Sequence, residues 1–194
     1  MSYIDVHDED KIRDTLYAEV KQVLQRLTGA SIVHIWSHVV RGKYADGIKP
    51  NEKAHIDTAE SWRQDLFRQY CTKPDSNIAP SAKYEFYNLW LPLLPVKNYP
   101  LAFCEPSSVD PDDILPVIYH GNDVPGQNCL LQHSKSQKWC YKSNQQPSEA
   151  WIFYQGAVAN LVMVFDKGVP HASFRLDGSG APRQSIEFKA MVFF

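Results

Sequence analysis

The chain has 194 residues, a length typical of one domain and sufficient to bury a substantial hydrophobic core. Its hydrophobic share of 44% and its formal net charge of −2 make nucleic acid or an anionic membrane surface an unexpected partner. No apolar run approaches the roughly 18–20 residues of a membrane-spanning helix, and the polar, acidic N-terminus does not resemble a secretory signal.

The four cysteines are scattered, without a Cys-x-x-Cys pair or a dense framework. In a chain without a secretory signal, this pattern favours free, buried thiols in a reducing compartment. The sequence therefore predicts a cytoplasmic protein. The cysteines are Cys71, Cys104, Cys129 and Cys140.

The first predicted element is a helix over about residues 10–28. Its apolar residues recur every three or four positions, and Gly29 follows where a C-cap glycine belongs. The next run, residues 30–42, is rich in β-branched residues and predicts a strand that Gly42 closes. The apolar positions of the helix are Ile12, Leu16, Val20, Val23, Leu24 and Leu27.

Residues 54–57 predict a short strand, and residues 58–71 predict a second, weaker helix with Thr58 or Ser61 as its N-cap. From residue 83 onward, short β-type runs alternate with proline and other turn residues. This pattern is typical of an antiparallel sandwich or barrel. The runs are KYEFYNLWLPL, LAFC, LPVIYH, QKWCYKS, EAWIFYQ, LVMVF, HASFRL and RQSIEFKAMVFF.

Three prolines, Pro92, Pro95 and Pro100, disfavour a single long strand across residues 90–101. The sequence has no internal repeat, low-complexity tract or interdomain linker. Residues 1–194 are therefore expected to form one domain, mainly β with flanking helices, on which the N-terminal helix packs. The mouth of an antiparallel barrel is a place where side chains of different strands converge.

His55 and Asp57 form a His-x-Asp pair in the predicted strand 54–57. Random placement of these residues would give roughly half of one His-x-Asp pair in a chain of this composition. By itself, the pair is therefore equally compatible with a polar surface turn. Two residues at i and i+2 of a strand do, however, point to the same side. Two His and one carboxylate can hold Fe(II) and leave positions open for substrates. The candidates for the third ligand are His7, His34, His38, His120, His133 and His171.

His171 stands out among these candidates by its context. It begins the β-type segment HASFRL after a turn-like DKGVP, and Arg183-Gln184-Ser185 follows before the final strand. A planar guanidinium pairs well with a carboxylate, and Ser185 can add a hydroxyl donor. The alternative for Arg183 is an ion pair with Glu187 on the surface.

The order His-x-Asp, a long gap, His and then Arg-x-Ser resembles the Fe(II)/2-oxoglutarate-dependent oxygenases. The resemblance implies a double-stranded β-helix, or jelly-roll, fold with Fe(II), 2-oxoglutarate as cosubstrate and O2 as oxidant. It also implies that His55, Asp57 and His171 are the iron ligands, and that Arg183 and Ser185 bind the distal carboxylate of 2-oxoglutarate.

A narrower resemblance is to the AsaB/CmcJ-like hydroxylase and desaturase family, which is mostly fungal and belongs to secondary metabolism. It rests on NLWLPLLPVKNYPLAFC, WCYKSNQQPSEAWIFYQ and the C-terminal PHASF and RQSIEFKAMVF blocks, in family order over most of residues 17–194. It implies a small secondary-metabolite or amino-acid-like substrate that is hydroxylated, desaturated or cyclised. The blocks also make Asn88 and Trp90 candidate pocket residues, although a place in the core is at least as well expected for Trp90.

The chain departs from the family in two ways. Leu91 stands where the family has an arginine, which removes one expected anion contact. Family members also commonly have a longer region before the first helix, so either a short form or a pocket completed in a homo- or hetero-oligomer is expected. These departures keep two alternatives open: an iron-dependent jelly-roll oxidase or isomerase that does not use 2-oxoglutarate, and a non-catalytic partner subunit.

The remaining histidines are expected to have structural roles. His34 and His38 lie in the predicted strand 30–42, with Trp36 between them on one face, and are interpreted as structural or pocket-lining. His7-x-Glu9 has ligand spacing but lies in a polar terminus without a rigid scaffold. Four aromatic residues alternate along two later strands and are expected in the core, with some of them lining the mouth of the barrel: Trp139, Tyr141, Trp151 and Phe153.

Overall fold

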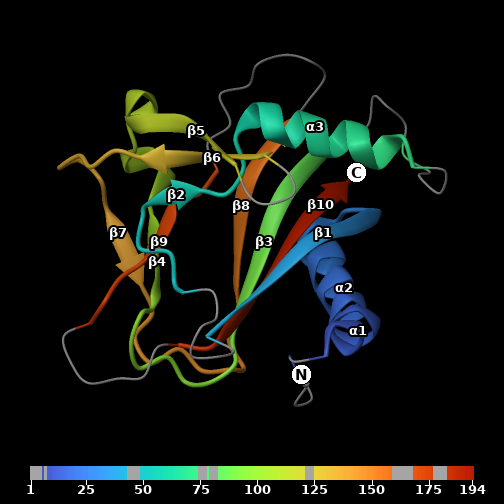
Figure 1. The fold of residues 1–194 in the computed structure, drawn as a ribbon, viewed down its shortest axis with the longest axis horizontal. Coiled ribbons are helices and arrows are strands. Elements are labelled where there is room, and N and C mark those ends of the chain that lie inside the picture. The colour runs from blue at the N-terminus through green and yellow to red at the C-terminus, as the bar shows by residue number, and fades with distance from the viewer. Residues whose placement is uncertain are drawn as a thin grey trace.

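The computed structural model describes residues 6, 8–42, 49–73, 78, 83–120, 125–158, 168–176 and 183–194. Its centre is a pair of antiparallel sheets that face each other, with the long helices on the outside (Figure 1). One sheet has four strands in the order β1-β10-β3-β8, and the other has six in the order β5-β6-β2-β9-β4-β7. This is the jelly roll that the family resemblance implies, and it agrees with the antiparallel sandwich or barrel that the strand pattern predicts.

The chain begins with helical elements and is mainly strand from β3 onward. The helical elements are α1 (Glu9–Lys11), η1 (Ile12–Leu16), α2 (Tyr17–Thr28), α3 (Glu60–Cys71), η2 (Pro106–Ser108) and η3 (Pro111–Asp113). The strands are β1 (Ile32–Arg41), β2 (His55–Ile56), β3 (Tyr84–Pro92), β4 (Leu101–Cys104), β5 (Ile114–His120), β6 (Pro125–Leu131), β7 (Trp139–Tyr141), β8 (Trp151–Val158), β9 (His171–Ser173) and β10 (Ser185–Phe193).

The N-terminal helical run packs on the outer face of the four-stranded sheet. Ile12, Leu16, Val20 and Leu24 are four residues apart, so they form one stripe, and all are buried against apolar side chains of the sheet. Leu27, which the same periodicity includes, lies in the last turn and is exposed. The run ends at Gly29, whose φ of 75° is the left-handed conformation of a C-cap glycine.

Helix α3 begins two residues later than its predicted start, and its predicted caps are wrong. The N-cap position is Ala59, which has no side-chain acceptor. The hydroxyl of Thr58 instead donates to the backbone oxygen of Gln155, and the hydroxyl of Ser61 donates to the side chain of Gln127. Both hydroxyls are therefore occupied by tertiary contacts that the local sequence does not reveal.

The prolines divide the central region as predicted, because β3 ends at Pro92 and β4 begins at Leu101. Strand β6 has no counterpart among the predicted runs, since its sequence PGQNCLL lacks a β-type pattern. It exists through its pairing with β5 on one side and β2 on the other. The predicted run LVMVF, residues 161–165, lies outside the described residues.

Strand β7 lies at the edge of the six-stranded sheet and is more exposed than predicted (Figure 1). Trp139 and Tyr141 are 39% and 46% exposed, so their assignment to the core is wrong, whereas Phe153 on β8 is buried. The thiol of Cys140 on the same edge strand is also exposed. All four cysteines are free, but only Cys104 and Cys129 are buried.

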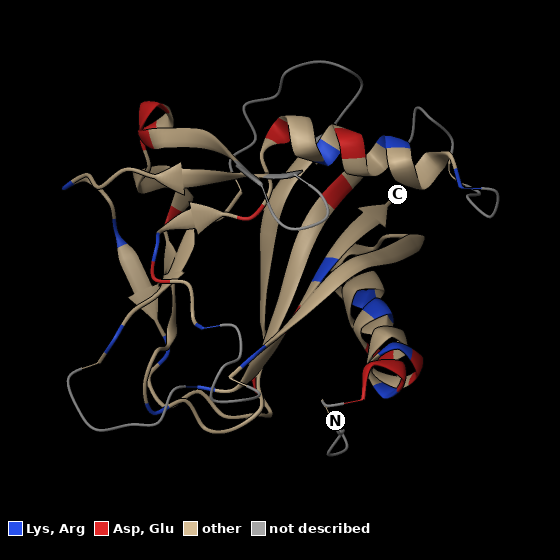
Figure 2. Ribbon diagram, viewed as in Figure 1, with Lys and Arg blue, Asp and Glu red and all other residues tan. Residues whose placement is uncertain are grey.

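Acidic and basic positions are interspersed over the helices and connecting segments, and the strands carry few of them (Figure 2). The charged residues that do point between the sheets therefore need a specific explanation. Within the described part of the chain, no helix is both long enough and apolar enough to cross a membrane.

Candidate metal centre

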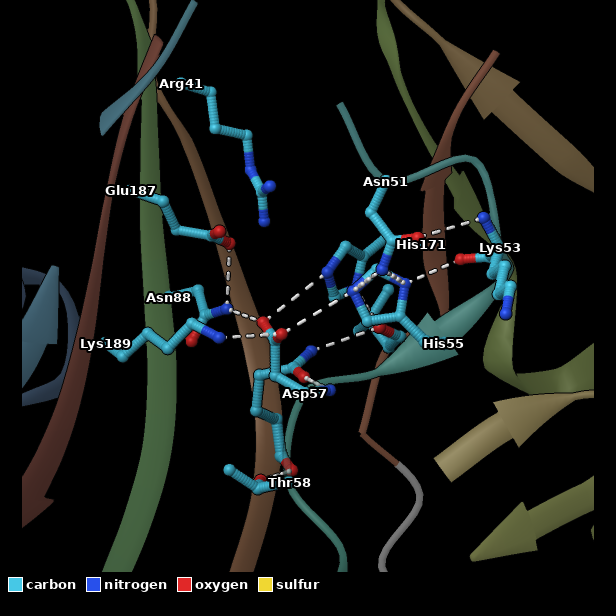
Figure 3. Close-up of polar contacts among 12 residues, drawn as sticks. Arg41, Asn51, Lys53, His55, Asp57, Thr58, Asn88, His171, Glu187 and Lys189 are labelled. Carbon is cyan, nitrogen blue, oxygen red and sulfur yellow. Dashed lines mark hydrogen bonds and ion pairs between the residues drawn. The ribbon is translucent and has the colours of Figure 1, made fainter. Parts of the chain in front are cut away.

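The structure brings His55, Asp57 and His171 together between the two sheets. His55 on β2 lies directly opposite His171 on the neighbouring antiparallel strand β9, and their ring centroids are 4.3 Å apart. Asp57 follows β2 and turns its carboxylate toward both rings (Figure 3). Each of the three residues offers one potential ligand atom, and these atoms all lie within 4.8 Å of one another.

The orientation of both imidazole rings is fixed by backbone carbonyl groups. Nδ1 of His55 lies 2.7 Å from the carbonyl oxygen of Lys53, and Nδ1 of His171 lies 3.1 Å from that of Val169. Because a carbonyl can only accept, Nδ1 carries a proton in both rings, so the lone pair of each ring in its neutral form lies on Nε2. Both Nε2 atoms lie 3.5 Å from the carboxylate oxygens of Asp57. Two Nε2 atoms and one carboxylate on one side fit Fe(II).

The carboxylate of Asp57 is held by residues of the opposite sheet. Nζ of Lys189 on β10 lies 2.7 Å from Oδ1, and the amide of Asn88 on β3 donates to Oδ2. Burial raises the pKa of Asp57, but the charge of Lys189, the hydrogen bonds of the two histidines and the charge of His171 together hold it well below its ordinary value. The carboxylate is therefore ionised, as a metal ligand has to be.

Gln155, a buried residue of β8, ties the two ligand-bearing segments together. Its side-chain oxygen accepts from the backbone N–H of Asp57 at 2.8 Å. Its amide nitrogen donates to the backbone oxygen of Val169 at 3.1 Å, two residues before His171. One side chain thereby fixes the backbone at Asp57 and at the residues just before His171.

Arg183 lines a small cavity together with the two histidines, and Ser185 contacts its guanidinium. The guanidinium of Arg183 donates to the carbonyl of Tyr99 at 2.6 Å, to the hydroxyl of Ser173 and to the hydroxyl of Ser185 at 3.4 Å. It also lies 4.9 Å from the ring centroid of Trp90.

The side chain of Arg183 is buried, and the alternative of a surface ion pair with Glu187 is wrong. The carboxylate of Glu187 accepts a hydrogen bond from Asn88 at 3.0 Å instead. Burial and the charge of Arg41 lower the pKa of Arg183 to about 10, against an opposing effect of Glu187. The guanidinium therefore stays cationic at neutral pH.

The cavity between the histidines and Arg183 has room for about one water molecule. Arg41, Asn51, Trp90 and Glu187 also contribute to its wall. A larger hollow of about 420 Å³ lies over the outer face of β4, β7 and β9, between Trp139 and Phe174. Neighbouring residues of a strand point to opposite faces, so this hollow opens away from His171.

The prediction that Leu91 removes an anion contact is wrong, because position 91 does not face the site. Leu91 on β3 is paired with Ile186 on β10, and both pack in the cluster under the N-terminal helix. Its neighbour Trp90 points between the sheets and lines the cavity. The alternation of a strand places a residue at position 91 on the helix side, whatever its charge.

The other histidine candidates lie elsewhere or outside the described side chains. The ring of His34 packs on Tyr70 of α3, with 4.0 Å between the centroids. His38 bonds the hydroxyl of Tyr17 and the carboxylate of Glu9. A ladder irregularity between residues 35 and 37 interrupts the alternation on which the placement of Trp36 relied. His133 is exposed, and His7 and the side chain of His120 are not among the described parts.

Several residues of the site are absent from the sequence-based prediction. Asn51, Gln155, Glu187, Lys189 and Arg41 all contact the ligands or line the cavity. A signal for part of this set exists in the last strand. Ser185, Glu187 and Lys189 alternate there with apolar residues, which marks a strand whose inner face is polar.

The whole chain matches a known family, and most of it aligns with named relatives. Residues 1–193 match the family model described as "Oxidoreductase/YMDC permease-like domain". The chain is 26% identical to the alpha-ketoglutarate-dependent dioxygenase tstK of Talaromyces stipitatus, with 100% of this chain and 74% of that protein covered. It is 27% identical to the hydroxylase/desaturase CTB9 of Cercospora beticola, with 92% of this chain and 63% of the relative covered.

A solved structure shows the same fold. It is that of the iron and alpha-ketoglutarate-dependent endoperoxidase NvfI, which superposes with a TM-score of 0.82 and 26% identity over 94% of this chain and 70% of that one. A protein of the same name in Aspergillus novofumigatus is 27% identical to this chain. The chain is similar to fungal Fe(II)/2-oxoglutarate-dependent dioxygenases, and the match over residues 1–193 shows that it belongs to this oxidoreductase family.

Proposed function

We propose that the protein is a non-heme Fe(II)/2-oxoglutarate-dependent oxygenase that oxidises a small secondary-metabolite or amino-acid-like molecule by hydroxylation, desaturation or ring closure. The observation that carries this proposal is the convergence of His55, Asp57 and His171, with ligand atoms within 4.8 Å of one another, beside the buried Arg183. When bound, Fe(II) and 2-oxoglutarate supply the O2-dependent oxidation of a substrate C–H bond. The named relatives that use iron and 2-oxoglutarate support the same assignment.

In this proposal, Nε2 of His55, Nε2 of His171 and a carboxylate oxygen of Asp57 hold the metal. The carbonyl groups of Lys53 and Val169 keep both rings in the required tautomer. Three protein ligands would leave open positions on the metal for cosubstrate and oxidant.

Arg183 and Ser185 would bind the distal carboxylate of 2-oxoglutarate. The guanidinium is held in place by neutral oxygen atoms of Tyr99, Ser173 and Ser185, so its charge is available to an anion. A charged hydrogen bond is stronger in a buried site than in water, because the surroundings screen it less. Trp90 closes the cavity beside it and helps to exclude water.

The alternative of a jelly-roll oxidase or isomerase without 2-oxoglutarate has lost its supporting observation. It depended on Leu91, whose side chain packs under the N-terminal helix. The cytoplasmic location and any assembly into a homo- or hetero-oligomer stay predictions.

An anaerobic titration tests the proposal. Adding Fe(II) and then 2-oxoglutarate to the wild-type protein should produce a weak charge-transfer band in the visible spectrum. His55→Ala and His171→Ala should abolish it, whereas the control His133→Ala, at an exposed position, should retain it. A His55→Ala variant that binds Fe(II) as the wild type does would show the proposed ligand set to be wrong. Turnover without succinate would exclude 2-oxoglutarate as cosubstrate.

A further inference from the structure

Arg41, the last residue of β1, lines the proposed cosubstrate cavity together with Arg183. Its Cα pairs with Ser185 across the β1–β10 ladder, so both side chains leave the sheet on the same face. Its guanidinium points into the space between Glu187 and His171 (Figure 3). The side chain is half-buried, and its Nη1 donates to the carbonyl of Lys49 at 2.8 Å.

The backbone after Arg41 is built for a close approach to Arg183. Gly42 has a φ of +73°, and a Cβ at this position would collide with the carbonyl oxygen of Arg183. A glycine is therefore required where these two segments cross. The two guanidinium groups are also close enough to interact electrostatically, because the charge of Arg41 lowers the pKa of Arg183.

The charged residues around the cavity favour the binding of an anion. The hydrogen-bond acceptors of Arg41 and Arg183 within the described chain are carbonyl and hydroxyl oxygens. Glu187 is the acid of the described cavity wall, so a single carboxylate, to which Asn88 also donates, faces two guanidinium groups. Two neighbouring guanidinium groups repel each other in a partly buried site unless an anion lies between them.

The size of the cavity indicates which side chain moves when a ligand enters. A five-carbon dicarboxylate needs far more space than the single water that the cavity admits. Arg183 is buried and held by three acceptors, whereas Arg41 is half-buried and, within the described chain, donates to one carbonyl. Arg41 is the long side chain that can swing aside at a small cost and close again over the ligand.

We infer that Arg41 is a second anion contact for the dicarboxylate cosubstrate, closing over the distal carboxylate that Arg183 and Ser185 hold from the buried side. This inference rests on the proposed function. Arg183 provides the fixed anchor, and Arg41 provides the mobile contact at the mouth. The pair makes the pocket selective for a 2-oxo acid with a second carboxylate over one without it.

The test compares two ligands by anaerobic titration of the Fe(II)-loaded protein, followed by the charge-transfer band. 2-Oxoglutarate has the distal carboxylate, and 2-oxopentanoate has the same metal-binding end without it. Arg41→Ala should weaken binding of 2-oxoglutarate roughly tenfold or more and leave 2-oxopentanoate within about twofold. Arg41→Lys should restore part of the loss, since it keeps the charge but not the planar fork.

The matched control is Arg68→Ala, which removes an exposed arginine of α3 that is paired with Asp65. It should change neither affinity. Unchanged 2-oxoglutarate binding in Arg41→Ala, or equal weakening of both ligands, would overturn the inference, and so would a change confined to the KM of the primary substrate. A wild-type protein without any charge-transfer band would instead refute the proposed function, and the inference with it.

Discussion

The side chain of Asn88 donates both to Asp57 and to Glu187, so one amide sets the position of two carboxylates. Of these, Asp57 faces the imidazoles, and Glu187 lines the cavity. Groups that orient a metal ligand without touching the metal commonly change its affinity 10- to 100-fold. Unlike Lys189, Asn88 does so without a charge that would repel a cation.

Asn88→Ala should therefore weaken Fe(II) binding by roughly 10- to 100-fold while the three ligands stay in place. Anaerobic competition with a metal-binding dye would measure this dissociation constant. The control is Asn144→Ala, an exposed asparagine that accepts from Lys97. Equal affinities of Asn88→Ala and the wild type would show that the carboxylate needs no such support.

His34 makes the stability of the protein sensitive to acid. Burial, with smaller effects of the charges of Lys73 and Lys21, lowers the pKa of its imidazole from 6.5 to about 4. Between these two values the unfolded chain binds a proton that the folded protein does not. His34 therefore does not change the free energy of unfolding above pH 6.5, and it lowers that free energy as the pH falls from 6.5 toward 4.

His34→Gln should flatten this loss, because its side chain does not titrate. Urea unfolding at a series of pH values from 7 to 4 would measure the slope. His133→Gln, at an exposed position, should keep the wild-type slope. If the two variants lose stability in parallel, another group controls the acid sensitivity.

At the scale of elements, the N-terminal helix is held to the sheet by its apolar stripe. Leu24 is 0% exposed and Leu27 is 66% exposed, although both are leucines of one helix. Leu24→Ala should lower the free energy of unfolding by about 2–5 kcal/mol, since it leaves a cavity against the sheet. Leu27→Ala should change it by less than about 0.5 kcal/mol. Denaturant unfolding of both variants checks the prediction, and similar losses would contradict the packing of the helix.

An element could be predicted from the sequence where the interactions that form it lie within its own segment. The stripe of Leu16, Val20 and Leu24 and the stop at Gly29 are local patterns, so the helix was visible in the sequence. Strand β6 was not, because it becomes a strand only by pairing with β5 and β2. The exposure of Tyr141 was also hidden, since an edge position is a property of the sheet and not of its sequence.

The site follows the same division. His55 and Asp57 could be paired from their spacing, because strand alternation is local. The choice of His171 among six histidines needed the resemblance to a family, since no spacing encodes which distant strand pairs with β2. Lys189, which reaches Asp57 from the opposite sheet, could be found only once the two sheets were placed.

At the scale of the whole molecule, metal binding should stabilise the fold. The two histidines come from neighbouring strands of one sheet, and Asp57, which follows one of these strands, is tied to the other sheet, so the assembled site exists only in the folded protein. Mn(II) at 100 times its dissociation constant should add about 2.7 kcal/mol, which corresponds to a rise in Tm of roughly 5–10 °C. Thermal unfolding with and without Mn(II) measures it. His171→Ala should show no rise, and an equal rise there would place the metal elsewhere.

Lys189 and Asn88 donate hydrogen bonds to Asp57 from the opposite sheet. The coordination of a bound metal would therefore also depend on how the two sheets are positioned relative to each other. The histidines move with the six-stranded sheet, while the donors to the carboxylate move with the four-stranded one. A substitution beneath the N-terminal helix that slides one sheet against the other would rotate the carboxylate relative to the imidazoles. The absorption spectrum of Co(II) in the site would record that displacement, even though none of the altered atoms touches the metal.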